Sequence, residues 1–249
     1  MPTSTPPAAS PDAAVVPAQD QVRQSLVEAI HLLAALGYSE GLAGHVSVRD
    51  PEDDNAYWVN PFGLDFHHVT PDDLLLVGSE GTVLRGTGAL NPSVDPLHGE
   101  LHRSRPDLTA FAHTHSMYGK TWSSLGRRLD PITQDACVLY QRHSVYGQFL
   151  GLVNARREGK EVVKTMGDGT AVIMQNHGFL TGGRSIGEAV WLFIVMERAA
   201  QSQLMAEASA SEPLLIPHDV AVDTGRALAK LEFADKQYRN LYETTCQRR

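Results

Sequence analysis

The sequence predicts one mixed α/β domain. Segments in which apolar residues recur every three to four positions alternate along the chain with short runs rich in strand formers. A chain of 249 residues with 42% hydrophobic residues can bury one large core. No internal repeat of about 20 to 50 residues is visible, so a solenoid or an array is not expected.

The expected elements begin after a leader. Residues 1–19 are rich in Pro, Ala and Ser and are predicted to be disordered, whereas residues 20–249 form the domain. An amphipathic helix is predicted from Asp20 to Gly37, because Val22, Leu26 and Ile30 share one face. Strands are predicted within residues 41–50, 56–63, 74–84 (two strands around a turn), 108–116 and 170–183 (two strands around a sharp loop).

The remaining segments are expected to be helical, with one exception. Helices are predicted over residues 96–105, 117–126, 158–166, 185–210 and 219–242. The helix from Ser185 is the clearest, because Ser185 and Glu188 have the spacing of a capping box. The exception is the segment 134–150, for which a loop is expected.

Composition excludes several classes of function. The formal net charge is −8, from 21 basic and 29 acidic residues, which is the wrong sign for a nucleic-acid partner. The longest apolar run, Ala189 to Met196, is too short to cross a membrane. No secretory signal is evident and the two cysteines match no disulfide framework, so a cytoplasmic protein that acts on a small molecule is expected.

Three histidines carry the strongest chemical signal. His113 and His115 are two positions apart on a predicted strand and therefore project from the same face, where two imidazoles can meet one metal ion. His177, in an Asn-His-Gly turn after another strand, is a candidate third ligand. The alternative is that these imidazoles only satisfy local hydrogen bonds, because about half a chance His-x-His pair is expected among 11 histidines.

Four motifs, in this order and spacing, resemble the class II aldolase and adducin head-domain family. They are GLAGHVSVRDP, WVNPFGLDF, RPDLTAFAHTHS and AVIMQNHGFLTGGRSIGEA, and the resemblance spans about residues 21–210. It implies a three-layer α/β/α domain around a central, mainly antiparallel sheet. It also implies a homotetramer with active sites at subunit interfaces, and His113, His115 and His177 as ligands of one divalent ion per subunit, zinc or iron(II), with manganese and cobalt as alternatives.

The sequence departs from the family's sugar-phosphate aldolases at the acid/base position. Where those enzymes place a carboxylate four residues before a helical histidine, this chain has Val94 before His98. Asp95 is one residue later, so either Asp95 or His98 is a candidate for proton transfer. The alternatives are a loop or helix-cap role for Asp95 and a buried structural role for His98. His102 is expected to be a surface or helix residue.

The phosphate pocket departs too. This chain has His45 where the family has Asn, and Phe62 where it has Ser, which predicts an unphosphorylated organic or aromatic acid as substrate. His45 and Asn60 are candidates for substrate binding, although a structural role for His45 beside the Gly44 turn is the alternative. By resemblance, Gln134 and Tyr140 approach the neighbouring subunit's metal cleft, as does His143, and the alternatives are interface, packing and solvated-loop roles.

Three functions are compatible with these features. The first is a metal-dependent lyase that cleaves a carbon–carbon bond next to a carbonyl, by retro-aldol cleavage or decarboxylation, through a metal-chelated enediolate. The second is a non-haem Fe(II) oxygenase that oxidatively decarboxylates a 2-oxo or aromatic acid. The third is a non-catalytic scaffold like the adducin head.

Overall fold

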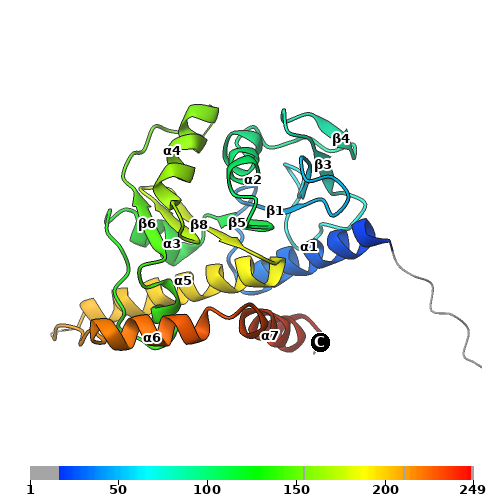
Figure 1. Cartoon of the computed structure of the whole chain (residues 1–249). Coiled ribbons are helices and arrows are strands. Elements are labelled where there is room, and N and C mark those ends of the chain that lie inside the picture. Colours follow the sequence, from blue (N-terminus) through cyan, green and yellow to red (C-terminus); the bar gives the residue numbers. More distant parts are fainter. Residues whose placement is uncertain (1–16, 154, 210, 248–249) are drawn as a thin grey trace, which may run out of the picture.

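The computed structural model describes residues 17–153, 155–209 and 211–247 (Figure 1). Its helices are α1 (Ala18–Ala35), α2 (Glu100–Ser104), α3 (Met117–Ser123), α4 (Arg156–Met166), α5 (Ile186–Glu207), α6 (His218–Leu228) and α7 (Leu231–Tyr242), with the short helical turns η1 (Asp95–Gly99), η2 (Asp135–Leu139) and η3 (Glu243–Gln247). Its strands are β1 (His45–Arg49), β2 (Tyr57–Val59), β3 (Leu75–Val77), β4 (Val83–Arg85), β5 (Ala110–Thr114), β6 (His143–Tyr146), β7 (Ala171–Met174) and β8 (Gly178–Gly183).

The eight strands form one sheet in the order β4-β3-β2-β1-β5-β8-β7-β6. Every neighbouring pair is antiparallel except β6 and β7, which are parallel. The expectation of a mainly antiparallel central sheet is therefore confirmed. In the register of β1 and β5, His45 lies opposite His113.

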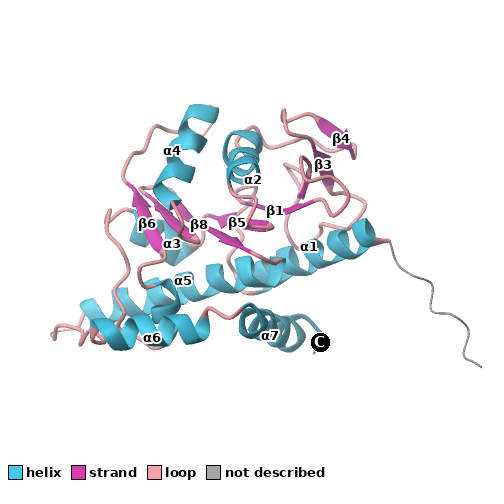
Figure 2. Cartoon of the chain, viewed as in Figure 1, coloured by secondary structure: helices cyan, strands magenta, loops and turns pink. Residues whose placement is uncertain are grey.

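Helices cover both faces of the sheet, which gives three layers (Figure 2). On one face, α1 and α5 pack in a core that includes Ala110 and Ala112 of β5. On the other face, η1, α2 and α4 enclose a second cluster around Phe111. Because successive residues of a strand point to opposite faces, His113 lies on the face of η1 and α2. The predicted α/β/α architecture is confirmed.

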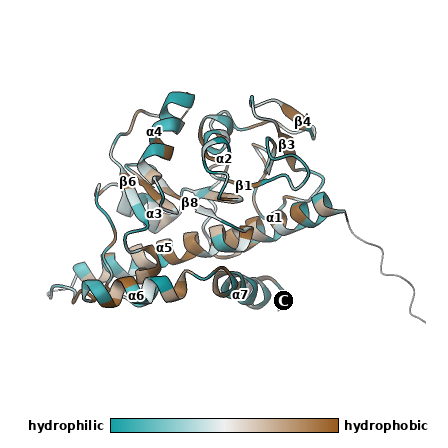
Figure 3. Cartoon of the chain, viewed as in Figure 1, coloured by the Kyte–Doolittle hydropathy of each residue, from teal (hydrophilic) through white to brown (hydrophobic). Residues whose placement is uncertain are grey.

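The long helix α5 is apolar around most of its surface because it lies between the sheet and the outer helices (Figure 3). Ser185 caps it as predicted, since the Glu188 N–H donates to Ser185 Oγ at 2.9 Å. The Glu188 carboxylate, however, accepts from the backbone N–H of Arg184 at 2.7 Å instead of completing the box at Ser185. None of the helices in the described ranges is long and apolar enough to span a membrane.

The structure corrects two segment predictions. Residues 134–150, expected to be a loop, contain η2 and the edge strand β6. Strand β6 has only four residues, and its pairing with β7 is a non-local contact that cannot be recognised from so short a segment. The expected final helix is two helices that break at Lys230, because α6 packs on η2 and α7 on α5. Most of the predicted leader lies outside the described residues, and α1 begins at Ala18, inside its last two positions.

Candidate metal centre

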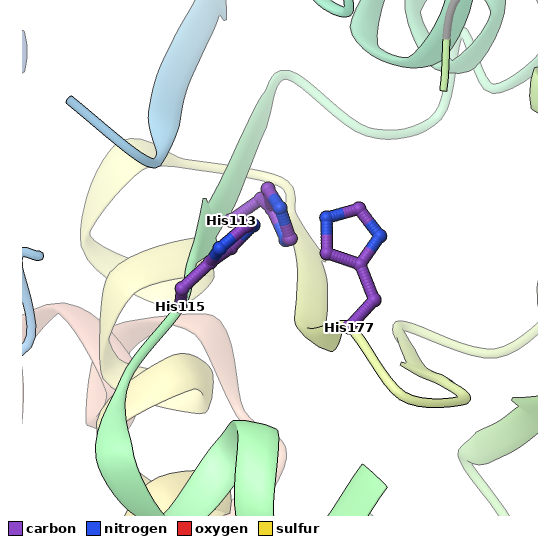
Figure 4. Close-up of side chains that lie close together, drawn as sticks. All are labelled: His113, His115 and His177. Atoms are coloured by element: carbon purple, nitrogen blue, oxygen red, sulfur yellow. The ribbon is translucent and has the colours of Figure 1, made fainter. Parts of the chain in front are cut away.

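Three imidazoles meet at the carboxyl end of β5. His113 is on that strand, His115 follows it, and His177 is in the turn between β7 and β8. One ligand atom from each lies within 4.8 Å of the others, and Figure 4 shows the rings close together around a common space. These three residues are called the histidine triad below. The structure thus brings together the three residues proposed from the sequence.

Hydrogen bonding fixes the tautomer of His113. Its Nδ1 lies 2.8 Å from the carbonyl oxygen of Phe179 on β8, and because a carbonyl only accepts, Nδ1 carries the proton. Nε2 is then left with a lone pair. A backbone carbonyl behind a metal-binding imidazole is the usual arrangement that orients such a ligand.

The turn that carries His177 is anchored to α3. Asn176 has a left-handed φ of 57°, a conformation that Asn tolerates better than most residues. The backbone N–H groups of Asn176 and His177 donate to the carbonyl and the hydroxyl of Ser123, at 3.2 and 3.1 Å. The imidazole is thereby held against the end of β5.

A buried glutamate holds the segment after His115. Glu197 of α5 accepts from Ser116 Oγ at 2.6 Å and from the Tyr118 N–H at 2.8 Å, at the amino end of α3. Burial raises the pKa of Glu197, and these hydrogen bonds oppose the rise. The start of α3, and with it the position of His115, is therefore fixed from the core.

The triad is held in the neutral form that metals bind. Burial lowers the pKa of His177 to about 4, helped by the proximity of His115. Burial also lowers the pKa of His115, and it lowers that of His113 well below its ordinary value. Because neutral imidazole is the ligand form, the three side chains suit a divalent ion of the type that nitrogen ligands favour.

The triad opens into a cavity of about 460 Å³. Its wall is mostly apolar, and it is lined by Leu42, Ala43, Gly44, His45, Phe62, Asn91, Pro92, Ser93, Leu97, His113, His115, Leu152, Val153 and His177. None of these lining residues is Lys or Arg. A cavity with an apolar wall and a few convergent polar groups is the usual form of a small-molecule site.

Beside the triad lies a row of hydrogen-bonded groups, called the histidine chain below. His45 Nδ1 lies 2.8 Å from His98 Nε2. Ser47 Oγ lies 2.6 Å from His98 Nδ1 and 2.8 Å from His102 Nε2. His45, Ser47, His98 and His102 are all at most 4% exposed. His45 also contacts the triad, with its ring centroid 5.1 Å from that of His113.

The structure does not bring Asp95 to the triad. A π-helical turn is present at η1, but the Asp95 carboxylate pairs with Arg103 at 3.1 Å and with Arg156 at 2.9 Å, and Asp95 is not among the residues lining the cavity. Val94, at the family's carboxylate position, is buried in an apolar cluster with Tyr57. His98 is one hydrogen bond removed from the cavity, through His45.

Asn60 supports strand β1 and not the cavity wall. Its Oδ1 accepts from the Val46 N–H at 2.9 Å, so it braces the strand that carries His45 and does not line the cavity. Gln134 and Tyr140 line pockets other than the one at the triad, and the Tyr140 hydroxyl contacts His218 at 3.0 Å. His143, a candidate for substrate contact with a solvated-loop role as its alternative, is 3% exposed, and its Nε2 accepts from the Leu129 N–H.

Two members of the histidine chain were not singled out from the sequence. Ser47 lies within the strand predicted over residues 41–50, and His102, expected to be a surface or helix residue, is on α2 but only 4% exposed. Their sequence spacing could have indicated the contact. His45 and Ser47 are two positions apart on β1, and they face His98 and His102, which are four positions apart on η1 and α2. Both spacings are about 6 to 7 Å, so the side chains can interleave.

Known proteins resemble the chain in sequence. A family model described as the class II aldolase and adducin N-terminal domain matches residues 24–204. "Decarboxylase NovR" of Streptomyces niveus is 37% identical over 222 residues, which is 88% of this chain and 82% of that protein. A Streptomyces roseochromogenus subsp. oscitans protein named "4-hydroxy-3-prenylphenylpyruvate oxygenase/4-hydroxy-3-prenylbenzoate synthase" is 36% identical and spans 88% of this chain and 80% of its own.

Solved structures agree with the family model. "L-fuculose 1-phosphate aldolase from Glaciozyma antarctica PI12" superposes with a TM-score of 0.85 at 35% identity and covers 95% of this chain and 93% of its own. The resemblance inferred from the four motifs is confirmed by these matches. The chain belongs to the class II aldolase and adducin N-terminal domain family.

Proposed function

We propose that this protein is a divalent-metal-dependent enzyme that cleaves a carbon–carbon bond next to a carbonyl group of an unphosphorylated hydroxy or oxo acid. The observation that carries this proposal is the histidine triad, three neutral imidazoles that open into one cavity. Such a set leaves coordination positions for a substrate, as catalytic sites do and closed structural sites do not.

A divalent ion held by the triad would supply Lewis-acid polarisation of the substrate carbonyl and stabilise the negative charge that develops beside it. The chain's own groups bind and orient the substrate. The apolar wall, which includes Phe62 and Leu97, offers contact to an apolar substrate body, and His45, whose Nδ1 is paired with His98, lines the same cavity. Asn60 fixes the backbone beside His45 through Val46.

The lining supports an acid with an apolar or aromatic body and no phosphate. No Lys or Arg among the lining residues is available to neutralise a phosphate dianion, and Phe62 fills the space where the family's sugar-phosphate aldolases have a small hydroxyl residue. Of the two Streptomyces relatives, one is named a decarboxylase and the other an oxygenase of a prenylated phenylpyruvate and synthase of a prenylated benzoate. They are 37% and 36% identical to this chain. Decarboxylation is therefore favoured over retro-aldol cleavage.

Proton transfer is assigned to the histidine chain in preference to Asp95. His98 is linked to the cavity through His45, whereas the Asp95 carboxylate is occupied by two guanidinium groups. In this proposal Asp95 maintains the position of η1. The site metal is zinc or iron(II), with manganese and cobalt as alternatives.

A homotetramer is part of the proposal. In the family arrangement, Gln134 and Tyr140 would reach the cavity of a neighbouring subunit, which is compatible with their absence from the lining of their own subunit's triad cavity. Light scattering of the purified protein should give about four times 27.1 kDa. A monomer with full activity would contradict this assignment. A cytoplasmic location is proposed as well, and fractionation of the producing cells tests it.

A second candidate is supported by one relative whose name includes an oxygenase activity. Three imidazoles with open positions also suit Fe(II), and O₂ would then be a co-substrate of the decarboxylation. The two reactions differ in their demand for O₂, because the lyase consumes none and the oxygenase consumes it in proportion to the CO₂ released.

The test uses protein loaded with Zn²⁺, Mn²⁺, Co²⁺ or Fe²⁺, with and without air. Aryl 2-oxo acids, aryl 2-hydroxy acids and sugar phosphates are supplied, and CO₂, aldehyde and O₂ are measured. We expect CO₂ from an unphosphorylated aryl acid and no cleavage of sugar phosphates. O₂ uptake matching CO₂ release would select the oxygenase. Metal binding without turnover of any compound would contradict the enzyme and favour the adducin-like scaffold.

A further inference from the structure

The histidine chain joins the cavity to the interior through three consecutive hydrogen bonds. His45 contacts the cavity, and the links then run to His98, to Ser47 and finally to His102. The ring of Tyr57 stacks on that of His102 with centroids 4.7 Å apart and planes 16° apart, which fixes the orientation of the last imidazole. The row therefore has one end at the triad cavity and the other at His102, which borders a separate cavity beside Arg49 and Arg103 but has its Nδ1 buried.

Each imidazole in this row is neutral, because His45, His98 and His102 are at most 4% exposed and none of them forms an ion pair with a carboxylate in the described part of the chain, so a buried positive charge would be uncompensated. A neutral imidazole has one N–H and one lone pair, and a hydroxyl donates one proton. Every link needs one donor and one acceptor. Ser47 is fully buried and its hydroxyl has no other hydrogen-bond partner in the described part of the chain, so it must donate one of its two links if its proton is to be paired. The direction of one hydrogen bond then sets the direction of all three.

Only two arrangements satisfy all three links and also pair the buried Ser47 hydroxyl proton. In the first, protons point inward: His45 Nδ1–H donates to His98, His98 to Ser47, and Ser47 to His102, so His102 keeps its own proton on Nδ1. In the second, protons point outward: His102 Nε2–H donates to Ser47, Ser47 to His98, and His98 to His45, so His45 carries its proton on Nε2.

The surroundings of His102 favour the outward arrangement over the inward one. His102 Nδ1 is buried and has no hydrogen-bond partner in the described part of the chain. The inward arrangement would leave a buried N–H unpaired there, which is the rarer and costlier defect, whereas the outward arrangement leaves only a lone pair. At the other end, an N–H on His45 Nε2 faces a cavity in which solvent or substrate can accept it.

We propose that His98, Ser47 and His102 are positioning residues that keep the proton of His45 on Nε2, so that His45 donates a hydrogen bond to an anionic oxygen of the bound substrate. This inference rests on the proposed function for the identity of the acceptor, a carboxylate or a developing enolate oxygen. A donor preorganised toward developing negative charge stabilises a transition state. The histidine chain thus favours substrates that place a hydrogen-bond acceptor next to His45 Nε2.

The first test measures the tautomer without turnover. The full-length protein, loaded with diamagnetic Zn²⁺ and labelled with ¹⁵N-histidine, is examined by long-range ¹H–¹⁵N correlation spectra, and the His45 signals are assigned by their loss in His45→Gln. The proposal predicts a proton on His45 Nε2 and a bare Nδ1. A proton on Nδ1 would overturn it, whether or not the enzyme turns over any acid.

The second test uses two matched variants at position 102, one of which should reverse the direction of the hydrogen bonds in the histidine chain. In His102→Glu, a carboxylate kept ionised by the nearby Arg49 and Arg103 can only accept, so Ser47 must donate to it and the His45 proton should move to Nδ1. In His102→Gln, the amide can still donate its N–H to Ser47, so the outward arrangement remains available and the Nε2 proton of His45 should be retained to a much greater extent than in His102→Glu. Retention of the Nε2 proton in His102→Glu would show that His102 does not set the tautomer.

Kinetics on a substrate found by the turnover screen supply a third readout. Relative to His102→Gln, His102→Glu should lower kcat by about 100-fold, the scale seen when one oxyanion donor is lost. Metal content should be equal in both variants. Equal kcat values despite a reversed tautomer would refute the donor role of His45, whereas absence of any turnover in the wild-type protein would count against the proposed function and leave the tautomer result standing.

Discussion

Two sets of three histidines lie side by side on the same face of the sheet, and their hydrogen bonds differ. In the histidine triad, a protein partner within the described residues occupies one ring nitrogen of His113, and other nitrogens face one another across a small space. In the histidine chain, His45 is hydrogen-bonded directly to His98, and Ser47 links His98 to His102. The same type of side chain therefore occurs in two different hydrogen-bonding arrangements a few ångströms apart.

The difference lies in which ring nitrogens already have a partner. A free lone pair aimed at a common point is a metal ligand, whereas a nitrogen tied to another side chain transmits orientation. Composition cannot distinguish the two sets, because both consist of neutral imidazoles that are buried or half-buried. Substitutions that disturb one set and leave the other intact can separate their roles.

The largest effect is expected from removal of a triad ligand. His115→Ala should reduce bound metal from about one ion per subunit to nearly none and abolish turnover, because a two-imidazole site binds far more weakly. Elemental analysis of protein dialysed against the metal measures this. His67→Ala, which removes an exposed imidazole paired with Asp65, is the control and should bind as the wild type does. Full metal content in His115→Ala would place the ion elsewhere.

Acid should destabilise the metal-free protein through the buried histidines. Their folded-state pKa values are lowered, so below about pH 6.5 the unfolded chain takes up protons that the folded chain does not, and stability falls as pH falls. Each such histidine contributes up to about 1.4 kcal/mol per pH unit. Urea unfolding between pH 7.5 and 5.5 measures the slope. It should decrease in His102→Phe, and an unchanged slope would mean that His102 is not held neutral.

A several-fold effect is expected at the cavity wall. Phe62→Ser removes apolar contact area and should raise KM for aryl acids about 10-fold, with little change in metal content, because Phe62 lines the cavity and touches neither set of histidines through a hydrogen bond. Steady-state kinetics on the aryl acid of the screen provides the measurement. If kcat falls and KM does not, the side chain acts in the chemical step instead of in binding.

The smallest effect on turnover is expected at Asp95. Asp95→Asn weakens the ion pairs with Arg103 and Arg156 and should cost about 1 kcal/mol of stability, while kcat stays within about twofold of the wild-type value. Denaturant unfolding and kinetics on the same sample separate the two effects. If turnover instead slows by about 100-fold or more while stability stays normal, acid/base catalysis belongs to this carboxylate.

Much of the fold followed from local patterns. The alternation around Val46 and Val48 and the capped helix from Ser185 are strong short-range signals, and the structure contains both elements. Strand β6 and the break at Lys230 were missed because packing against distant elements produces them. Four residues of an edge strand have too few alternations to be recognised, and helix propensity continues through position 230.

The site was predictable in part for the same reason. His113 and His115 share a strand face by simple alternation, and the four family motifs supplied His177. The roles of Ser47 and His102 depend on how β1 faces η1 and α2, a relation between segments more than 50 residues apart. The ion pairs that occupy Asp95 involve Arg156 of α4, which no spacing near Asp95 indicates.

The central claim is that the histidine triad holds a catalytic metal ion at the edge of the apolar cavity. A crystal structure measured at the absorption edge of the bound metal tests this most directly, because anomalous density locates the ion without assumptions about activity. We predict one peak per subunit within about 2.0–2.3 Å of a nitrogen from each of His113, His115 and His177. A peak bound elsewhere, or metal-replete protein with no peak at these three side chains, would contradict this claim.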